Sequence, residues 1–203
     1  MEASAADPQA ASLFDTTSNF HQLRIEPYLL TTGQRHSPLT GYFEEEAARL
    51  ERTRECLVHG DYSPKNILVG NQRLVLLDCE VAWYGDPSFD LAFLVNHLLL
   101  KSLYHAPKNI GVQSLFANLV NTYCLERGFG KDMQLEFELR TARLLLLLLL
   151  ARIDGKSPVE YLDIGKRDFV RRFVTSELRA GAVTLVGLAT DWFRALHKQY
   201  RKN

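Results

Sequence analysis

The chain of 203 residues is long enough for one domain with a sizeable core, and its 46% hydrophobic content excludes a largely disordered protein. Lysine plus arginine number 24 and aspartate plus glutamate number 24, so no overall field would attract nucleic acid or an anionic membrane. The three cysteines are widely spaced and outside any Cys-x-x-Cys pattern, which excludes a disulfide framework and favours a reducing, cytoplasmic setting.

The first part of the chain predicts a leader followed by helices. Residues 1–18 are rich in Ala, Ser and Asp, so we expect a flexible leader there and one domain over 19–203. Residues 20–32 predict a helix with imperfect apolar periodicity, and 33–41 read as a loop because Gly, Ser, Pro and Thr dominate. Residues 43–56 have a helix-forming composition of Glu, Ala, Arg and Leu.

Short apolar runs at 56–58, 67–69 and 73–77 predict strands. The last two are separated by Gly70-Asn71-Gln72, a turn sequence that favours a β-hairpin. Pairing of these strands would bring Asn66 and Asp78, which flank the hairpin, close together.

From Pro87 onward the pattern is helical. We expect helices at 88–104, 114–127, 135–152, 166–179 and 181–201, and a short one opening at 157–160, where Ser, Pro and Glu form a helix-start pattern. The leucine run 144–150 has seven residues, against about 20 for a membrane span, so it predicts a buried core helix. The expected fold class is α+β, predominantly α, with a small β-hairpin.

One segment carries the residue types that phosphoryl transfer requires. A carboxylate must orient the acceptor hydroxyl and take its proton, and hard oxygen ligands must hold metal ions against the phosphates. In the sequence from His59 to Asn66, Asp61 suits the first role and the Asn66 amide can supply a metal ligand. Asp78 and Glu80 follow the second hairpin strand and share a face if the chain is extended there, so both are candidate metal ligands.

These motifs resemble a family of small-molecule kinases. Asp61 followed at the fifth position by Asn66 is similar to the catalytic loop of kinases, and its His-Gly-Asp form resembles the aminoglycoside phosphotransferases and choline kinases. Asp78-Cys79-Glu80 resembles their metal-binding segment, and 84–92 resembles their Gly-Asp-Pro-x-x-Asp-Leu-Ala segment. The resemblance covers about residues 20–165. It implies a protein-kinase-like C-terminal lobe, in which Asp90 braces the catalytic loop from below.

Other residues of this segment have a structural alternative beside the functional one. His59 is expected to support the loop by packing and hydrogen bonding rather than to react. Ser63 and Lys65 are candidates for phosphate or substrate contact, against a loop hydrogen bond for Ser63 and plain exposure for Lys65. Asp61 has the alternative of a turn or cap residue, and Cys79 is expected to point inward.

The resemblance implies an ATP-dependent enzyme, with GTP as the alternative, that uses Mg²⁺ to phosphorylate a hydroxyl of an aminoglycoside, choline, sugar or amino alcohol. No nucleic acid or membrane partner is expected. Acids of the helical part are candidates for holding a cationic acceptor, with simple solvent exposure as the alternative: Glu136, Glu138, Asp154, Glu160 and Asp163.

The 58 residues before His59 contain no Gly-x-Gly-x-x-Gly loop and no strand lysine of the kind that clamps ATP. We therefore expect the N-terminal lobe to be missing, with a separately encoded lobe as a candidate partner and little activity from this lobe alone. The alternative is a non-catalytic, kinase-like binding or scaffold module.

Overall fold

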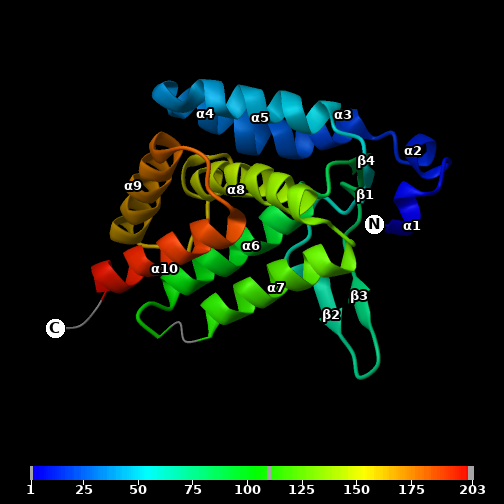
Figure 1. Cartoon of the computed structure of the whole chain (residues 1–203). Coiled ribbons are helices and arrows are strands. Elements are labelled where there is room, and N and C mark those ends of the chain that lie inside the picture. The colour runs from blue at the N-terminus through cyan, green and yellow to red at the C-terminus, as the bar shows by residue number, and fades with distance from the viewer. Residues whose placement is uncertain (1, 109–110, 201–203) are drawn as a thin grey trace.

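The computed structural model describes residues 2–108 and 111–200. The described part is mostly helical and holds two antiparallel sheets of two strands each. Helices α4 and α5 lie on one side of α8, while α6, α7 and α10 lie on the other, and the β2–β3 hairpin projects from the end where β1 and β4 lie (Figure 1). The predominantly helical α+β class expected from the sequence is therefore confirmed.

The first residues pack against the first small sheet. Helices α1 (Glu2–Ala5), α2 (Ala10–Leu13) and α3 (Thr17–Phe20) are each a single turn. Tyr84 donates its backbone N–H to the Phe14 carbonyl at 2.9 Å, and the Thr16 hydroxyl donates to the Ala82 carbonyl at 2.6 Å. The segment expected to be a flexible leader thus has specific partners here, and its mobility in solution stays a prediction.

The helix expected at 20–32 is longer and less regular than its sequence suggests. The helical course continues from α3 through the π-helical segment η1 (His21–Leu30) into α4 (Thr31–Arg35), and a 3₁₀ turn, η2 (Ser37–Leu39), leads to α5 (Thr40–Arg52). The loop predicted for 33–41 is therefore largely helical. Gly33 lies within α4, at a point where α5 packs closely against it. A Cβ atom at Gly33 would lie 3.0 Å from the Phe43 Cβ.

The hairpin predicted from the Gly-Asn turn is present. Strands β2 (Ile67–Val69) and β3 (Leu74–Leu76) pair in antiparallel register, with Ile67 opposite Leu76. Strand β1 (Cys56–Val58) pairs instead with β4 (Trp83–Gly85), a strand the sequence did not predict. The β1–β4 pair brings the two ends of the chemistry-bearing segment together.

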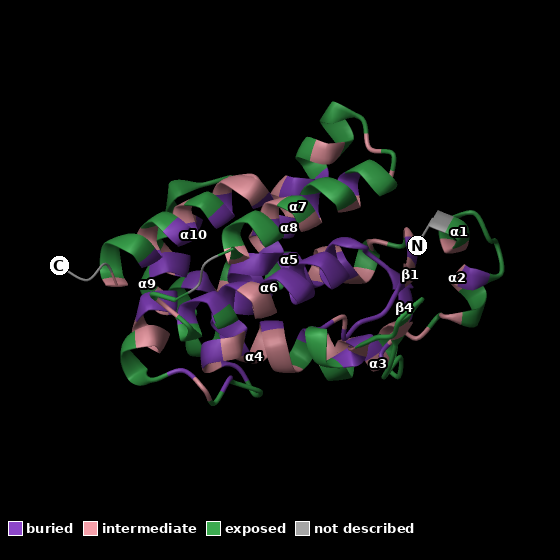
Figure 2. Cartoon of the chain, turned by 90° about the horizontal axis from the view of Figure 1, so that it is seen from below, coloured by how far each residue is buried: buried purple, intermediate pink, exposed green. Residues whose placement is uncertain are grey.

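The remaining helices form the core. Figure 2 shows buried residues concentrated along the central helices α6 and α8, and Leu144–Leu150 are all buried, which confirms the leucine run as core. Within the described ranges, no helix combines the length and apolar character that crossing a bilayer requires. The bounds are α6 Ser88–Tyr104, α7 Val112–Glu126, α8 Lys131–Asp154, α9 Ile164–Ala180 and α10 Leu185–Tyr200.

The helix predicted to open at 157–160 is wrong. That segment is a bend without a helical turn. Arg152 donates to both the carbonyl and the hydroxyl of Ser157, and the Val159 N–H donates back to the Arg152 carbonyl at 2.8 Å. Contacts with the end of α8 thus take the groups that a new helix would have used. Of the last predicted helix, 181–201, residue 201 lies outside the described residues.

Candidate active site

The candidate catalytic loop, residues 59–66, which is called the catalytic loop below, joins β1 to the hairpin and depends on a glycine at its start. Gly60 has φ +79°, and a Cβ atom there would lie 2.6 Å from the Val81 carbonyl oxygen. A side chain at this position would be both strained and obstructed. The sharp bend at Gly60 places Asp61 against the body of the lobe, where it is buried.

Asp90 holds the loop from below. Its side chain is 3% exposed, and its two carboxylate oxygens accept the backbone N–H groups of His59 at 2.8 Å and Gly60 at 3.0 Å. Burial raises the pKa of Asp90 from 3.8 to about 6, and the two backbone hydrogen bonds oppose that rise. The structure places Asp90 where the resemblance implied a brace, at the start of α6.

His59 ties the loop to the hairpin. Its Nε2 lies 2.9 Å from the Leu77 carbonyl oxygen, and its Nδ1 accepts the Asp61 backbone N–H at 3.2 Å. These partners assign the proton to Nε2, because a carbonyl can only accept and a backbone N–H can only donate. Both ring nitrogens are thereby occupied in positioning, which supports the structural interpretation of His59.

Asn66 connects the same two elements from the other end of the loop. Its side-chain nitrogen donates to the Asp61 carbonyl at 3.0 Å, and its backbone carbonyl accepts the Leu77 N–H at 2.9 Å. The second bond continues the hairpin ladder and sets Leu77, the residue before Asp78, opposite Asn66. With the nitrogen engaged, the amide oxygen is the atom left for a ligand.

Asp78 and Glu80 follow the hairpin on the exposed side. Neither carboxylate forms a hydrogen bond or ion pair with another described residue. Asp78 has φ +67°, an uncommon left-handed conformation that aspartate tolerates better than most residues. Extended geometry between the two, which the sequence argument assumed, is therefore interrupted at Asp78.

The oxygen donors of this region suit Mg²⁺. Mg²⁺ is usually held by one or two carboxylates together with substrate phosphates and water, rather than by a cage of protein ligands. Open carboxylates and a free amide oxygen fit that pattern. Among the described residues no three His, Cys, Asp or Glu side chains form a metal-binding group, so substrate oxygens would have to complete the coordination.

Two cations face Asp61. The Lys65 Nζ lies 3.2 Å from Asp61 Oδ2, and Arg24 Nη2 lies 3.6 Å from the same oxygen. Arg24 also donates from Nε to the Gly60 carbonyl at 2.6 Å, so it fixes the backbone as well as the carboxylate. Sequence reasoning missed Arg24, because a residue 36 positions before Gly60 carries no local signal of this contact.

Ser63 and Cys79 differ from what their sequence context suggested. Ser63 is fully buried, and no described residue hydrogen-bonds to its hydroxyl oxygen, so the expected loop hydrogen bond is not formed by that side chain. Cys79 is exposed, which corrects the expectation that it points inward. The tight turn after Asp78 directs this part of the chain toward solvent.

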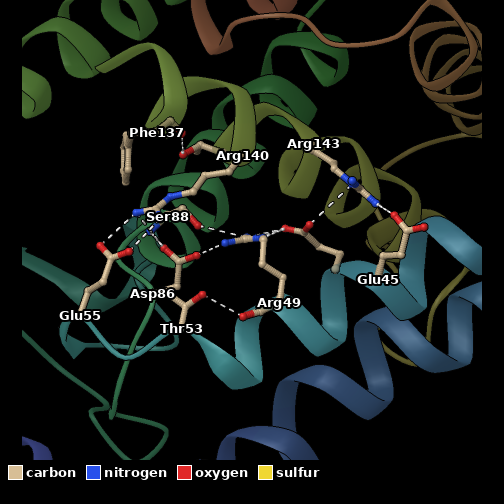
Figure 3. Close-up of polar contacts among 11 residues, drawn as sticks. Glu45, Arg49, Thr53, Glu55, Asp86, Ser88, Phe137, Arg140 and Arg143 are labelled. Atoms are coloured by element: carbon tan, nitrogen blue, oxygen red, sulfur yellow. Dashed lines mark hydrogen bonds and ion pairs between the residues drawn. The ribbon is translucent and has the colours of Figure 1, made fainter. Parts of the chain in front are cut away.

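An ion network behind the loop anchors the Gly-Asp-Pro segment. Asp86 is completely buried, accepts the Ser88 N–H at 2.8 Å, and forms ion pairs with Arg49 and, at 3.5 Å, with Arg140 (Figure 3). Arg49 also pairs with the buried Glu46. The start of α6 is therefore tied to α5 and α8, and Asp90 one turn later inherits that fixed position.

The acids considered for a cationic acceptor are engaged elsewhere or lie apart from the loop. Asp154 pairs with Arg171 and His36. Glu138 accepts from Gln134 and from the Val186 N–H, and Asp163 caps α9 through the Lys166 N–H. Glu136 lines a cavity of about 450 Å³ between α5, α8 and the α9–α10 connection, and no catalytic-loop residue lines that cavity.

Comparison of the chain with known proteins identifies a family. The chain matches the model described as "Phosphotransferase enzyme family" over residues 4–106. It is also 31% identical over 91 residues to mouse "Acyl-CoA dehydrogenase family member 11", a match that covers 40% of this chain and 12% of that protein. The family match includes the loop, the hairpin and the whole of α6. The chain belongs to the phosphotransferase enzyme family.

Proposed function

We propose that this lobe transfers the γ-phosphoryl group of ATP, with GTP as the alternative donor, to a hydroxyl of a small molecule. The observation that carries the proposal is that Asn66 hydrogen-bonds both to the Asp61 backbone carbonyl and, through its own carbonyl, to Leu77, the residue before Asp78. Family membership supports the same reaction class.

Asp61 would act on the acceptor. Its carboxylate orients the hydroxyl and takes its proton as the oxygen–phosphorus bond forms and the bond from phosphorus to the leaving diphosphate breaks. Lys65 and Arg24 fix the carboxylate, and Lys65, being exposed, is available to phosphate oxygens. Ser63 has a buried hydroxyl without a hydrogen-bond partner among the described residues, so it has no reactive role in this proposal.

Asn66, Asp78 and Glu80 would hold Mg²⁺, which when bound neutralises charge that develops on the phosphates. Asp90 and His59 position the loop and do not touch the reacting atoms in this proposal. A reducing, cytoplasmic setting completes it, since Cys56, Cys79 and Cys124 are all free thiols.

Positioning of ATP needs a further element. The 203 residues contain no Gly-x-Gly-x-x-Gly loop, and positioning accounts for most of the catalysis in phosphoryl transfer. We propose that a second lobe, on the same or a separate polypeptide, supplies the clamp over the phosphates.

A non-catalytic binding module is the second candidate. The observation that favours it is the pairing of Asp61 with Arg24 and Lys65, because two cations occupy the carboxylate oxygen that would otherwise meet an acceptor hydroxyl. Such a module would bind Mg²⁺ and nucleotide without turnover.

The test is phosphoryl transfer from radiolabelled ATP to a panel of hydroxyl compounds, measured with and without a clamping lobe from a relative. We expect Asp61→Asn to lower the rate by about 10²- to 10⁴-fold, while the exposed control Asp132→Asn leaves it unchanged. Equal rates for Asp61→Asn and the wild type would refute the role of Asp61. Nucleotide binding without any transfer would instead favour the binding module.

A further inference from the structure

A stripe of basic and aromatic side chains leads away from the catalytic loop along α6. Phe93, His97 and Lys101 follow one another at intervals of four residues, so they share one face of that helix. Exposure increases along the face, from buried Phe93 through half-buried His97 to exposed Lys101. We define the basic–aromatic stripe as these three residues together with the side chains that contact them or one another around this face: Tyr28, Arg152 and Tyr161.

The stripe begins at the candidate base. Arg24, which lies 3.6 Å from Asp61, has its guanidinium carbon 5.8 Å from the ring centres of both Tyr28 and Phe93. The ring centres of Phe93 and His97 are 5.3 Å apart. A molecule whose hydroxyl meets Asp61 would therefore extend over this surface.

The positive charges of the stripe have no carboxylate partner among the described residues, although Arg152 Nη1 donates to the carbonyl and hydroxyl of Ser157. The Arg152 guanidinium carbon lies 5.9 Å from the Tyr28 ring centre, and its buried Nε has no hydrogen-bond partner among the described residues. Lys101 Nζ lies 3.9 Å from the Tyr161 ring centre. Neither cation forms an ion pair with a carboxylate in the described part of the chain, although a half-buried charge such as that of Arg152 is ordinarily paired.

Two acids close to the stripe in the chain, Glu26 and Asp154, are already paired with other cations. Glu26, on η1, lies 2.5 Å from Lys156 Nζ. Asp154, two residues after Arg152, binds Arg171 and His36. The surplus of positive charge on this face is therefore not cancelled by these neighbours.

His97 contributes hydrogen bonding rather than charge. Burial, followed by the positive charge of Arg152, lowers the pKa of His97 to about 4. The ring is neutral near pH 7 and offers one donor and one acceptor. Charges on Arg152, Asp61, Lys65 and Lys101 all act on its pKa.

Resting on the proposed function, we propose that the acceptor is an anionic hydroxyl compound, a hydroxy acid or a phosphorylated polyol. Arg152 and Lys101 bind its carboxylate or phosphate, and Tyr28 and Tyr161 cover its carbon skeleton. Charge-assisted hydrogen bonds from arginine favour such groups. A cationic acceptor of the aminoglycoside or choline type would meet like charge at Arg152 and Lys101.

The test uses four ligands that share a six-carbon skeleton: glucose, glucosamine, gluconate and glucose 6-phosphate. Binding to the isotope-labelled chain is followed by NMR titration, in parallel with Mg²⁺-ATP. We expect the two anions to bind about tenfold more tightly than glucose, with glucosamine the weakest, and Arg152→Gln or Lys101→Gln to remove that preference. Matched controls are Arg172→Gln and Lys198→Gln, both exposed and on other helices.

The outcomes separate the inference from the proposed function. Tighter binding of glucosamine or glucose than of the anions, or an anion preference that survives both substitutions, would overturn the inference. An equal loss of Mg²⁺-ATP affinity in Arg152→Gln would assign the stripe to the nucleotide and overturn it too. Phosphoryl transfer to cationic acceptors alone would support the kinase assignment and refute the proposal of an anionic acceptor. Anion binding without any transfer would support the anion-binding surface and refute the kinase assignment.

Discussion

The acidic residues on the two sides of the catalytic loop differ in burial and in hydrogen bonding. On the inner side, Asp86 and Asp90 are 0% and 3% exposed, and each is engaged by backbone N–H groups, Asp86 also by arginines. On the outer side, Asp78 and Glu80 are exposed and have no described partner. Buried polar groups must be satisfied to be tolerated, so the inner acids maintain the geometry. The outer acids remain open for a metal ion or substrate.

The difference separates stability from chemistry. Removing a partner on the inner side leaves a buried charge unpaired, which lowers the stability of the fold. Removing a carboxylate on the outer side leaves no buried group unpaired, because water already solvates that carboxylate. Substitutions on the inner side should therefore lower the free energy of unfolding. Substitutions on the outer side should weaken ligand binding and change the free energy of unfolding little.

The largest effect is expected for Arg49→Met, which keeps the length of the side chain and removes its charge. Glu46, 1% exposed, and Asp86 would lose their shared guanidinium. We expect a loss of about 3–5 kcal/mol in the free energy of unfolding, measured by urea denaturation. Arg194→Met, which removes an exposed pair with Asp191, should cost less than about 0.5 kcal/mol. Similar losses for both variants would show that the inner network does not stabilise the fold.

Asp90→Asn should have the next largest effect on stability, because one loop N–H would face an amide NH₂ group instead of an acceptor. We expect a loss of about 1–3 kcal/mol near pH 7. The folded-state pKa of Asp90, about 6, exceeds its ordinary value of 3.8. The folded protein therefore binds this proton more tightly, and the contribution of Asp90 to stability falls as the pH rises from about 4 to 6.

The pH dependence gives the Asp90 prediction its control. The variant cannot titrate at this position, so its deficit relative to the wild type should be larger at pH 4 than at pH 7, by up to about 3 kcal/mol. Urea denaturation of both proteins across this range measures the difference. A deficit that grows toward pH 7 would mean that Asp90 is held as a carboxylate with a lowered pKa.

Local patterns made part of this comparison predictable. The hairpin followed from a Gly-Asn turn between apolar runs, and α6 has the predicted bounds, Ser88–Tyr104, because a proline start and a continuous apolar run are local signals. The motif order placed Asp61, Asn66 and Asp78 in one segment. Each of these inferences depends on residues that are close in the sequence, separated by no more than about the length of one helix or hairpin.

Contacts between distant segments were not predictable in the same way. Strand β4 is three residues long and exists through its pairing with β1, so its own sequence carries little signal. Arg24 reaches Asp61 because η1 packs over the loop, which depends on tertiary structure. The helix expected at 157–160 was lost to hydrogen bonds from Arg152, again a tertiary effect over a local propensity.

The smallest effect on stability is expected at Asp78→Gly, on the outer side. Glycine adopts φ +67° without the steric cost borne by a Cβ atom, while it loses more conformational freedom on folding. These terms nearly cancel, so the free energy of unfolding should change by less than about 1 kcal/mol. Mg²⁺-dependent binding of ATP, measured by calorimetry with and without the metal, should be lost, because one of the proposed carboxylate ligands is gone. A variant that unfolds easily, or one that keeps metal-dependent binding, would remove the distinction between the two sides of the loop. Stability that survives while metal-dependent binding disappears would show that the outer acids contribute to chemistry and not to the fold.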